Sequence, residues 1–167
     1  MEPGRDAWEL LKRVWMTEGP DRIILPVDPI ELSEKIGIVA LLDDEMEPEV
    51  SGVLKKESGF RDPEILLNPI DTRDRRRFIC AHAIGHYSRN VEMRRNGAWN
   101  VVEGRDFFAP SSDPDESYAT EFAGELLMPR AVLRELDDTT STASLASLFG
   151  VTGDVMSARL DRIGWRR

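Results

Sequence analysis

Apolar residues in the first third of the chain follow two patterns, helical spacing and short continuous runs. Residues 6–17 carry apolar side chains three and four positions apart, and residues 28–37 begin with Asp-Pro and end at a glycine. These features predict two helices. Strands are predicted over 38–42, 50–56 and 64–68, where short apolar runs alternate with acidic or glycine-containing turns. A small antiparallel or mixed sheet follows from them.

The rest of the chain has mainly helical patterns. One helix is predicted from residue 71 or 72 to about 89, and another over 113–129, which begins with Asp-Pro and ends at a proline. An ordered loop with one short strand should join them. Apolar positions around Gly150 predict two short helices and a turn. We therefore expect an α+β fold with a main domain over 1–129 and a helical appendage over 130–167.

The amino-acid composition predicts one domain and argues against a nucleic-acid partner. The 167 residues, 41% of them hydrophobic, suffice for one sizeable core but not for two. Acidic residues outnumber basic ones by 31 to 22, which gives a net charge of −9. Because a protein that holds phosphate backbones needs positive charge, no nucleic-acid partner is expected.

Cysteine usage and hydropathy indicate the compartment. Cys80 is the single cysteine, so no disulfide can form within the chain. The first residues lack the basic start and apolar run of a signal peptide, and the longest apolar run is far too short to span a bilayer. These features predict a cytoplasmic protein that does not enter a membrane.

The chain's two histidines, His82 and His86, lie four positions apart within the predicted 71–89 helix. Side chains at this spacing share one helix face, so both imidazoles can reach one zinc ion. The helix is apolar nearly all round, and a buried histidine pair without metal would need two separate sets of hydrogen-bond partners. Two ordinary core or surface histidines remain the alternative, which this pair alone does not exclude.

Glu116 is the candidate third ligand, because it falls within the apolar arc of the 113–129 helix that includes Phe122. A carboxylate on a buried face needs a cationic partner, and a metal held by the histidines would be one. A capping role competes for the same group, since Asp113 as N-cap puts Glu116 at the third helical position. Thr120, one turn further on, is placed to support a ligand histidine by a hydrogen bond. Tyr118 falls on the outer face of the same helix and is given no role at the site.

The tail sequence LASLFGVTGDVMSARLDRIG looks like a helix-turn-helix, in which Arg159 and Arg162 of the second helix would face DNA. Asp154 and Asp161 lie on the same helix and oppose that role. Helical hairpins of this kind are also common packing units. We therefore favour a structural or substrate-docking role for the tail over DNA binding.

Two sequence blocks resemble the ImmA/IrrE family of bacterial and phage zinc metallopeptidases. The family signature contains Arg-Phe-x-x-Ala-His-Glu-x-Gly-His after an arginine-rich lead, and RRFICAHAIGHY departs from it at Ala83, where the family has glutamate. Further along, the family has a helix reading Glu-x-x-Ala-Asn-x-Phe-Ala-x-x-Leu-Leu-Met-Pro, and ESYATEFAGELLMP departs from it at Thr120. LPVDPIELSEKIGI, SGVL and EILLNP also look like the family's upstream elements, so the resemblance covers most of the chain.

This resemblance implies a minimal thermolysin-like zincin fold, with a small sheet packed on the zinc-binding helix and a C-terminal helical appendage. It implies Zn²⁺ as the cofactor, His82, His86 and Glu116 as its ligands, and Ala83 at the position of the general base. It also implies a function, site-specific cleavage of a helix-turn-helix transcriptional regulator in phage, mobile-element, stress or toxin–antitoxin control. A basic regulator would be attracted to a chain of charge −9.

Ala83 changes the expected chemistry. In the family, the glutamate at this position takes a proton from the zinc-activated water and delivers it to the leaving amine, which alanine cannot do. General acid–base assistance is worth about 10² to 10⁴ in rate, so the Ala83 chain should bind zinc and substrate yet cleave little or nothing. Because the rest of the motif is intact, we favour an inactivating substitution. A natural pseudopeptidase or toxin–antitoxin component that acts by protein binding is the alternative.

Overall fold

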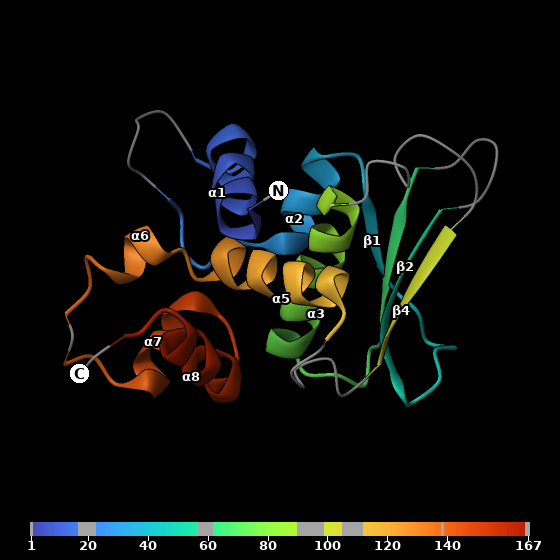
Figure 1. Ribbon diagram of the computed structural model, residues 1–167. Coiled ribbons are helices and arrows are strands. Elements are labelled where there is room, and N and C mark those ends of the chain that lie inside the picture. Colours follow the sequence, from blue (N-terminus) through green and yellow to red (C-terminus); the bar gives the residue numbers. More distant parts are fainter. Residues whose placement is uncertain are drawn as a thin grey trace.

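The computed structural model describes residues 2–16, 23–56, 62–89, 99–104, 112–137 and 139–165. No helix in this part of the chain is long and apolar enough to cross a membrane. The elements, labelled in Figure 1, are α1 (Pro3–Val14), α2 (Pro29–Lys35), β1 (Val39–Leu42), β2 (Val50–Lys56), β3 (Glu64–Leu67), α3 (Arg73–Arg89), β4 (Trp99–Gly104), α5 (Pro114–Leu127), α6 (Arg130–Leu133), α7 (Thr142–Phe149) and α8 (Gly153–Arg162).

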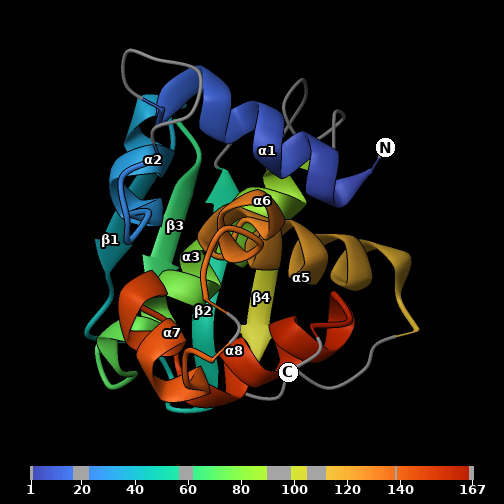
Figure 2. The same ribbon diagram turned by 90° about the vertical axis from the view of Figure 1, so that its left-hand side faces the viewer.

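The sheet is mixed and has the strand order β1-β3-β2-β4. β1 pairs with β3 in parallel, whereas β2 pairs with β3 and β4 in antiparallel fashion. Leu54, Ile65 and Leu67 of this sheet are buried in the same core as the apolar residues of α3. Figure 1 shows α3 and α5 between the sheet and the α7–α8 hairpin, and Figure 2 shows α1 across the top of the molecule. The predicted α+β architecture is confirmed.

Helices α3 and α5 cross at very short range. A Cβ atom built on Gly85 would lie 2.9 Å from the Cα atom of Ala119 and 3.1 Å from its carbonyl oxygen. Glycine is needed there because it allows two backbones to approach each other closely. Every residue of α3 from Arg77 to His86 is accordingly buried. The crossing brings the histidine face of α3 next to the first turns of α5.

Local sequence signals set the ends of the short helices. The carboxylate of Asp28 accepts hydrogen bonds from the backbone amides of Ile30 and Glu31 and thereby caps α2. Gly37, just past that helix, has a φ of 80°, a left-handed value that favours glycine. Gly150 ends α7 in the same way with a φ of 64°. Both glycine stops agree with the sequence pattern.

Two buried arginines fasten the α7–α8 hairpin to the rest of the molecule. Arg77 of α3 donates from Nε to the carbonyl oxygen of Gly150 at 2.8 Å. Arg159 of α8 forms ion pairs with Glu121, at 3.0 Å, and with Glu125 of α5. Apolar residues of the hairpin also belong to the same hydrophobic core as the sheet and α3. The domain boundary predicted before the hairpin stays a prediction.

The structure corrects two details of the sequence-based expectations. α1 begins at Pro3 rather than at residue 6, because proline suits the first position of a helix. The helical pattern places Tyr118 on the outer face of α5, and this prediction is wrong: α1 packs there, Tyr118 is buried, and its hydroxyl donates to Asp6 at 2.7 Å. In the predicted loop between α3 and α5, β4 is the expected short strand, and residues 90–98 and 105–111 lie outside the described residues.

Candidate metal centre

His82 and His86 project from α3 so that their Nε2 atoms lie 3.0 Å apart. The two rings meet edge to face, with centroids 4.8 Å apart and planes inclined by 67°. Both side chains are buried, with residue exposures of 0% and 5%. This geometry follows from the four-residue spacing on a helix, which the sequence predicts, and it rules out two unrelated histidine environments.

Glu116 completes the cluster from α5. Its Oε2 lies 3.3 Å from Nε2 of His82, and its Oε1 lies 3.2 Å from Nε2 of His86. Asp113 caps the helix and accepts a hydrogen bond from the amide of Asp115 at 2.8 Å. The carboxylate of Glu116 therefore lies against the histidines, as the metal hypothesis requires, while Asp113 provides the cap.

The three side chains fit a zinc ion. Zinc bonds of about 2.0 to 2.2 Å at tetrahedral angles place ligand atoms about 3.3 to 3.6 Å apart. The two Nε2 atoms lie 3.0 Å apart, and each lies 3.2 to 3.3 Å from a different oxygen of Glu116. With one ligand atom taken from each residue, the three atoms lie within 4.8 Å of one another, so a small adjustment of the side chains brings them to that spacing. Three protein ligands leave one coordination position for water or substrate. The side chain of Glu116 is 31% exposed, so the cluster can be reached from solvent.

The electrostatics of the cluster suit a divalent cation. Burial, together with the neighbouring His82, lowers the pKa of His86 from 6.5 to about 4. The hydrogen bond with His82 holds the pKa of Glu116 below its ordinary value. At neutral pH His86 is therefore a neutral imidazole and Glu116 is a carboxylate, which are the protonation states that metal ligands need.

Ala83, for which the sequence resemblance predicts the position of the general base, lies in the core and is only 1% exposed. Cys80, three residues earlier, is fully buried, and burial raises the pKa of its thiol well above the ordinary range. Neither residue joins the cluster. Among the described residues, the group of histidine, cysteine and acidic side chains with metal-ligand geometry consists of His82, His86 and Glu116.

Thr120 lies on α5 one turn beyond Glu116 and is half-buried. It faces a hollow between α5, α3 and α8. Its expected role in supporting a ligand histidine stays a prediction. The same hollow includes Phe78, whose ring centroid lies 6.4 Å from that of His82.

Sequence reasoning missed Arg89, which ties the two ligand-bearing helices together near the cluster. Its Nε lies 2.5 Å from Oδ1 of Asp115, beside Glu116 in the chain. Its guanidinium also lies 5.1 Å from the ring centre of Tyr118. The available signal was charge placement, since Arg89 stands in the last turn of one helix and Asp115 in the first turn of the next. The pair holds the first turn of α5 against the end of α3.

Comparison with known protein families agrees with this geometry. Residues 34–161 match the model of peptidase family M78, which is described as the IrrE N-terminal-like domain. The match includes all three residues of the cluster and most of the α7–α8 hairpin, and it excludes α1. A search among curated proteins found no match. The resemblance drawn from the two sequence blocks is confirmed, and the chain belongs to the M78 family of IrrE-like peptidases.

Proposed function

We propose that His82, His86 and Glu116 hold a zinc ion and that the scaffold is that of a zinc-dependent endopeptidase. The convergence of three ligand atoms within 4.8 Å of one another carries this proposal. Zinc bound there supplies a Lewis acid that polarises a substrate carbonyl and lowers the pKa of water. The chain's own part is to position the metal and to exclude water from the buried side of the cluster.

In this proposal the Ala83 chain binds metal and substrate but does not turn over. Ala83 carries no group that can take or return a proton, and it is buried beside the first histidine. Loss of the general base lowers the rate of peptide hydrolysis by a factor of about 10² to 10⁴. An inactivating substitution in an otherwise intact peptidase site accounts for this combination.

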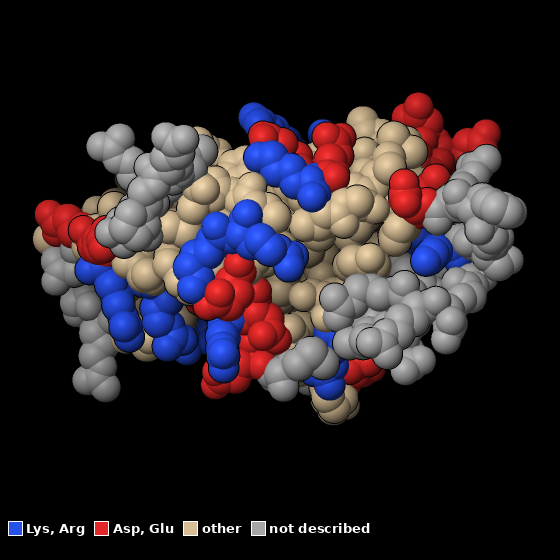
Figure 3. All heavy atoms as spheres, turned by 90° about the horizontal axis from the view of Figure 1, so that it is seen from above, with Lys and Arg blue, Asp and Glu red and all other residues tan. Residues whose placement is uncertain are grey.

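The proposed substrate is a helix-turn-helix regulator of phage, mobile-element, stress or toxin–antitoxin genes, as the family resemblance implies. A net charge of −9 supports attraction of a basic DNA-binding protein. On the face shown in Figure 3, lysine and arginine side chains lie beside aspartate and glutamate side chains. The proposed attraction therefore comes from the overall charge of the chain, because the described residues on that face form no single acidic patch.

A second candidate function is a pseudopeptidase that acts by protein binding alone. Ala83 favours it, since the ligand cluster is complete and the proton-transfer group is missing. In that case the same site would hold a regulator or an antitoxin partner without cleaving it.

The test restores the glutamate. The Ala83→Glu variant, the matched Ala83→Gln variant and the parent chain are loaded with zinc and incubated with the helix-turn-helix regulator encoded beside the gene. Intact mass then reports cleavage. We expect cleavage by Ala83→Glu alone, and a chelator should stop it. If no variant cuts but all bind the regulator, the binding module is the correct function.

A further inference from the structure

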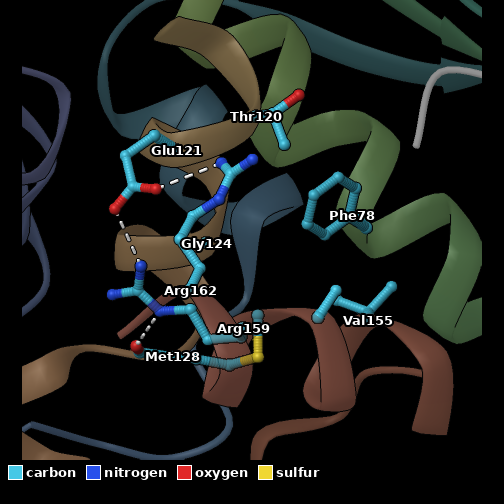
Figure 4. A pocket seen from close by; sticks show the side chains of 9 residues that line it. Phe78, Thr120, Glu121, Gly124, Met128, Val155, Arg159 and Arg162 are labelled. Carbon is cyan, nitrogen blue, oxygen red and sulfur yellow. Dashed lines mark hydrogen bonds and ion pairs between the residues drawn. The ribbon is translucent and has the colours of Figure 1, made fainter. Parts of the chain in front are cut away.

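A hollow lies beside the candidate metal centre, between α3, α5 and α8. Its empty volume is about 470 Å³, counted to its open mouth. Phe78 of α3, Thr120 of α5 and Val155 of α8 line it (Figure 4). The α7–α8 hairpin therefore supplies one wall of a cavity whose other walls belong to the ligand-bearing helices.

The hollow begins one helical turn from the metal cluster on both helices. Phe78 precedes His82 by four residues, and Thr120 follows Glu116 by four residues. Residues four apart on a helix are neighbours on one face, about 5 to 6 Å apart between Cβ atoms. A peptide whose carbonyl lies at the cluster can therefore place an adjacent side chain in the hollow.

One side of the hollow is apolar, and the other carries an ion-paired group of acids and arginines, in which Arg159 also pairs with Glu125. Phe78 and Val155 form the apolar side, opposite the group made by Glu121, Arg159 and Arg162 (Figure 4). Each oxygen of the Glu121 carboxylate already accepts from an arginine, one from Arg159 at 3.0 Å and the other from Arg162 at 3.1 Å. A lysine side chain would meet two guanidinium groups and an acid that is already paired.

We propose that this hollow is the specificity pocket of the enzyme and takes a leucine-sized apolar side chain of the residue next to the scissile bond. The proposal rests on the proposed peptidase function. The position of Phe78 and Thr120, each one helical turn from a residue of the metal cluster, argues for a substrate side chain as the occupant. The apolar wall favours leucine, and the two arginines disfavour lysine. On this account the α7–α8 hairpin selects the substrate.

Peptide hydroxamates test the pocket without any need for turnover. The hydroxamate group binds zinc, so a series with glycine, leucine, glutamate or lysine at the adjacent position varies the pocket contact alone. Binding to the zinc-loaded full chain is measured by titration calorimetry. We expect leucine to bind at least about tenfold more tightly than glycine, as burial of its side chain predicts. Lysine should bind the most weakly of the four.

Two tryptophan variants test whether the preference for leucine over glycine arises in the hollow. Ala158 lines the hollow and is exposed, so Ala158→Trp should fill the mouth without disturbing the core. Ser157, its exposed neighbour on α8, is not part of the lining, so Ser157→Trp is the matched control. The preference for leucine over glycine should fall to about twofold or less in Ala158→Trp and persist in Ser157→Trp.

The outcomes separate the pocket from the metal centre. If all four hydroxamates bind the zinc-loaded chain equally, or if Ala158→Trp keeps the preference for leucine, the pocket inference is wrong and the metal centre stands. If no hydroxamate binds and the chain retains no zinc, the proposed function fails, and the pocket inference fails with it.

Discussion

The position of Glu116 distinguishes a candidate metal site from a buried pair of histidines on α3. Its position three residues after Asp113 suits a capping box as well as a metal ligand, so the sequence leaves two roles for one carboxylate. The α3–α5 crossing favours the ligand role, because it brings the carboxylate within 3.3 Å of both imidazoles. This long-range packing contact leaves no local pattern in the sequence, and the role of Glu116 as a metal ligand stays a proposal.

We predict that the metal-free chain becomes less stable as the pH falls from about 6.5 to about 4. His86 has a lowered pKa of about 4 in the folded chain against 6.5 as its ordinary value. Over this window the unfolded chain binds a proton that the folded chain does not, so stability is present above pH 6.5 and is lost as the pH falls. The expected loss is on the order of 2 to 3 kcal/mol. Urea unfolding across this range, with metal removed, measures it.

The control for this pH dependence is His86→Gln, which removes the titrating group and keeps a polar side chain of similar length. Groups that do not contact His86 keep their surroundings in both proteins, so the difference between the two curves reports His86 together with its contact to Glu116. Parallel curves would show that His86 is not protonated more readily on unfolding and would contradict the prediction.

At the scale of elements, the crossing of α3 and α5 is the contact on which the site depends. We predict that Gly85→Ala destabilises the chain by about 1 to 3 kcal/mol, since the added Cβ atom would lie 2.9 Å from the backbone of Ala119 and must displace α5. The same displacement should weaken zinc binding. Chemical unfolding and zinc titration of the variant check both effects.

Gly153→Ala is the matched control, because a Cβ atom at Gly153 would meet nothing within 4 Å. This variant should leave stability unchanged or raise it by up to about 1 kcal/mol, since alanine restricts the unfolded chain. If both variants lost the same amount of stability, the close approach of α3 and α5 would not be what makes Gly85 necessary.

Most helices and strands could be predicted from the sequence because their signals are local. Asp28 and Gly37 bound α2, and Asp113 begins α5, each through a contact with its own segment. Tyr118 could not be placed, since the helix that covers it comes from the opposite end of the sequence. Whether a segment forms a helix or a strand therefore depends on residues nearby in the sequence. Which face of a helix is buried depends on packing against distant segments.

At the scale of the whole molecule, the α7–α8 hairpin is part of the same core as the peptidase scaffold. Arg159, one of the two arginines that a helix-turn-helix interpretation would turn towards DNA, is 4% exposed and pairs with Glu121 and Glu125 instead. The sequence showed the two helices of the hairpin but not this attachment, because ion pairs across more than thirty residues leave no local pattern. The buried arginine opposes the DNA-binding interpretation.

We predict that Arg159→Ala destabilises the chain by about 3 to 5 kcal/mol, because it leaves the buried carboxylate of Glu125 without its cationic partner. The neighbouring Arg162 has a side chain that is 51% exposed, so Arg162→Ala should cost about 1 kcal/mol or less. Thermal or urea unfolding of the two variants compares them directly. Equal small losses would mean that the hairpin is not fastened through Arg159.

Native mass spectrometry of the zinc-treated, dialysed chain measures whether His82, His86 and Glu116 together hold one zinc ion. We expect one zinc per chain for the parent protein and for Ala83→Glu. We expect none, or a strongly reduced fraction, for Glu116→Gln and for His86→Gln, with both variants still folded by circular dichroism. A parent chain that retains no zinc, or a Glu116→Gln variant that retains it as fully as the parent does, would contradict the proposed zinc site.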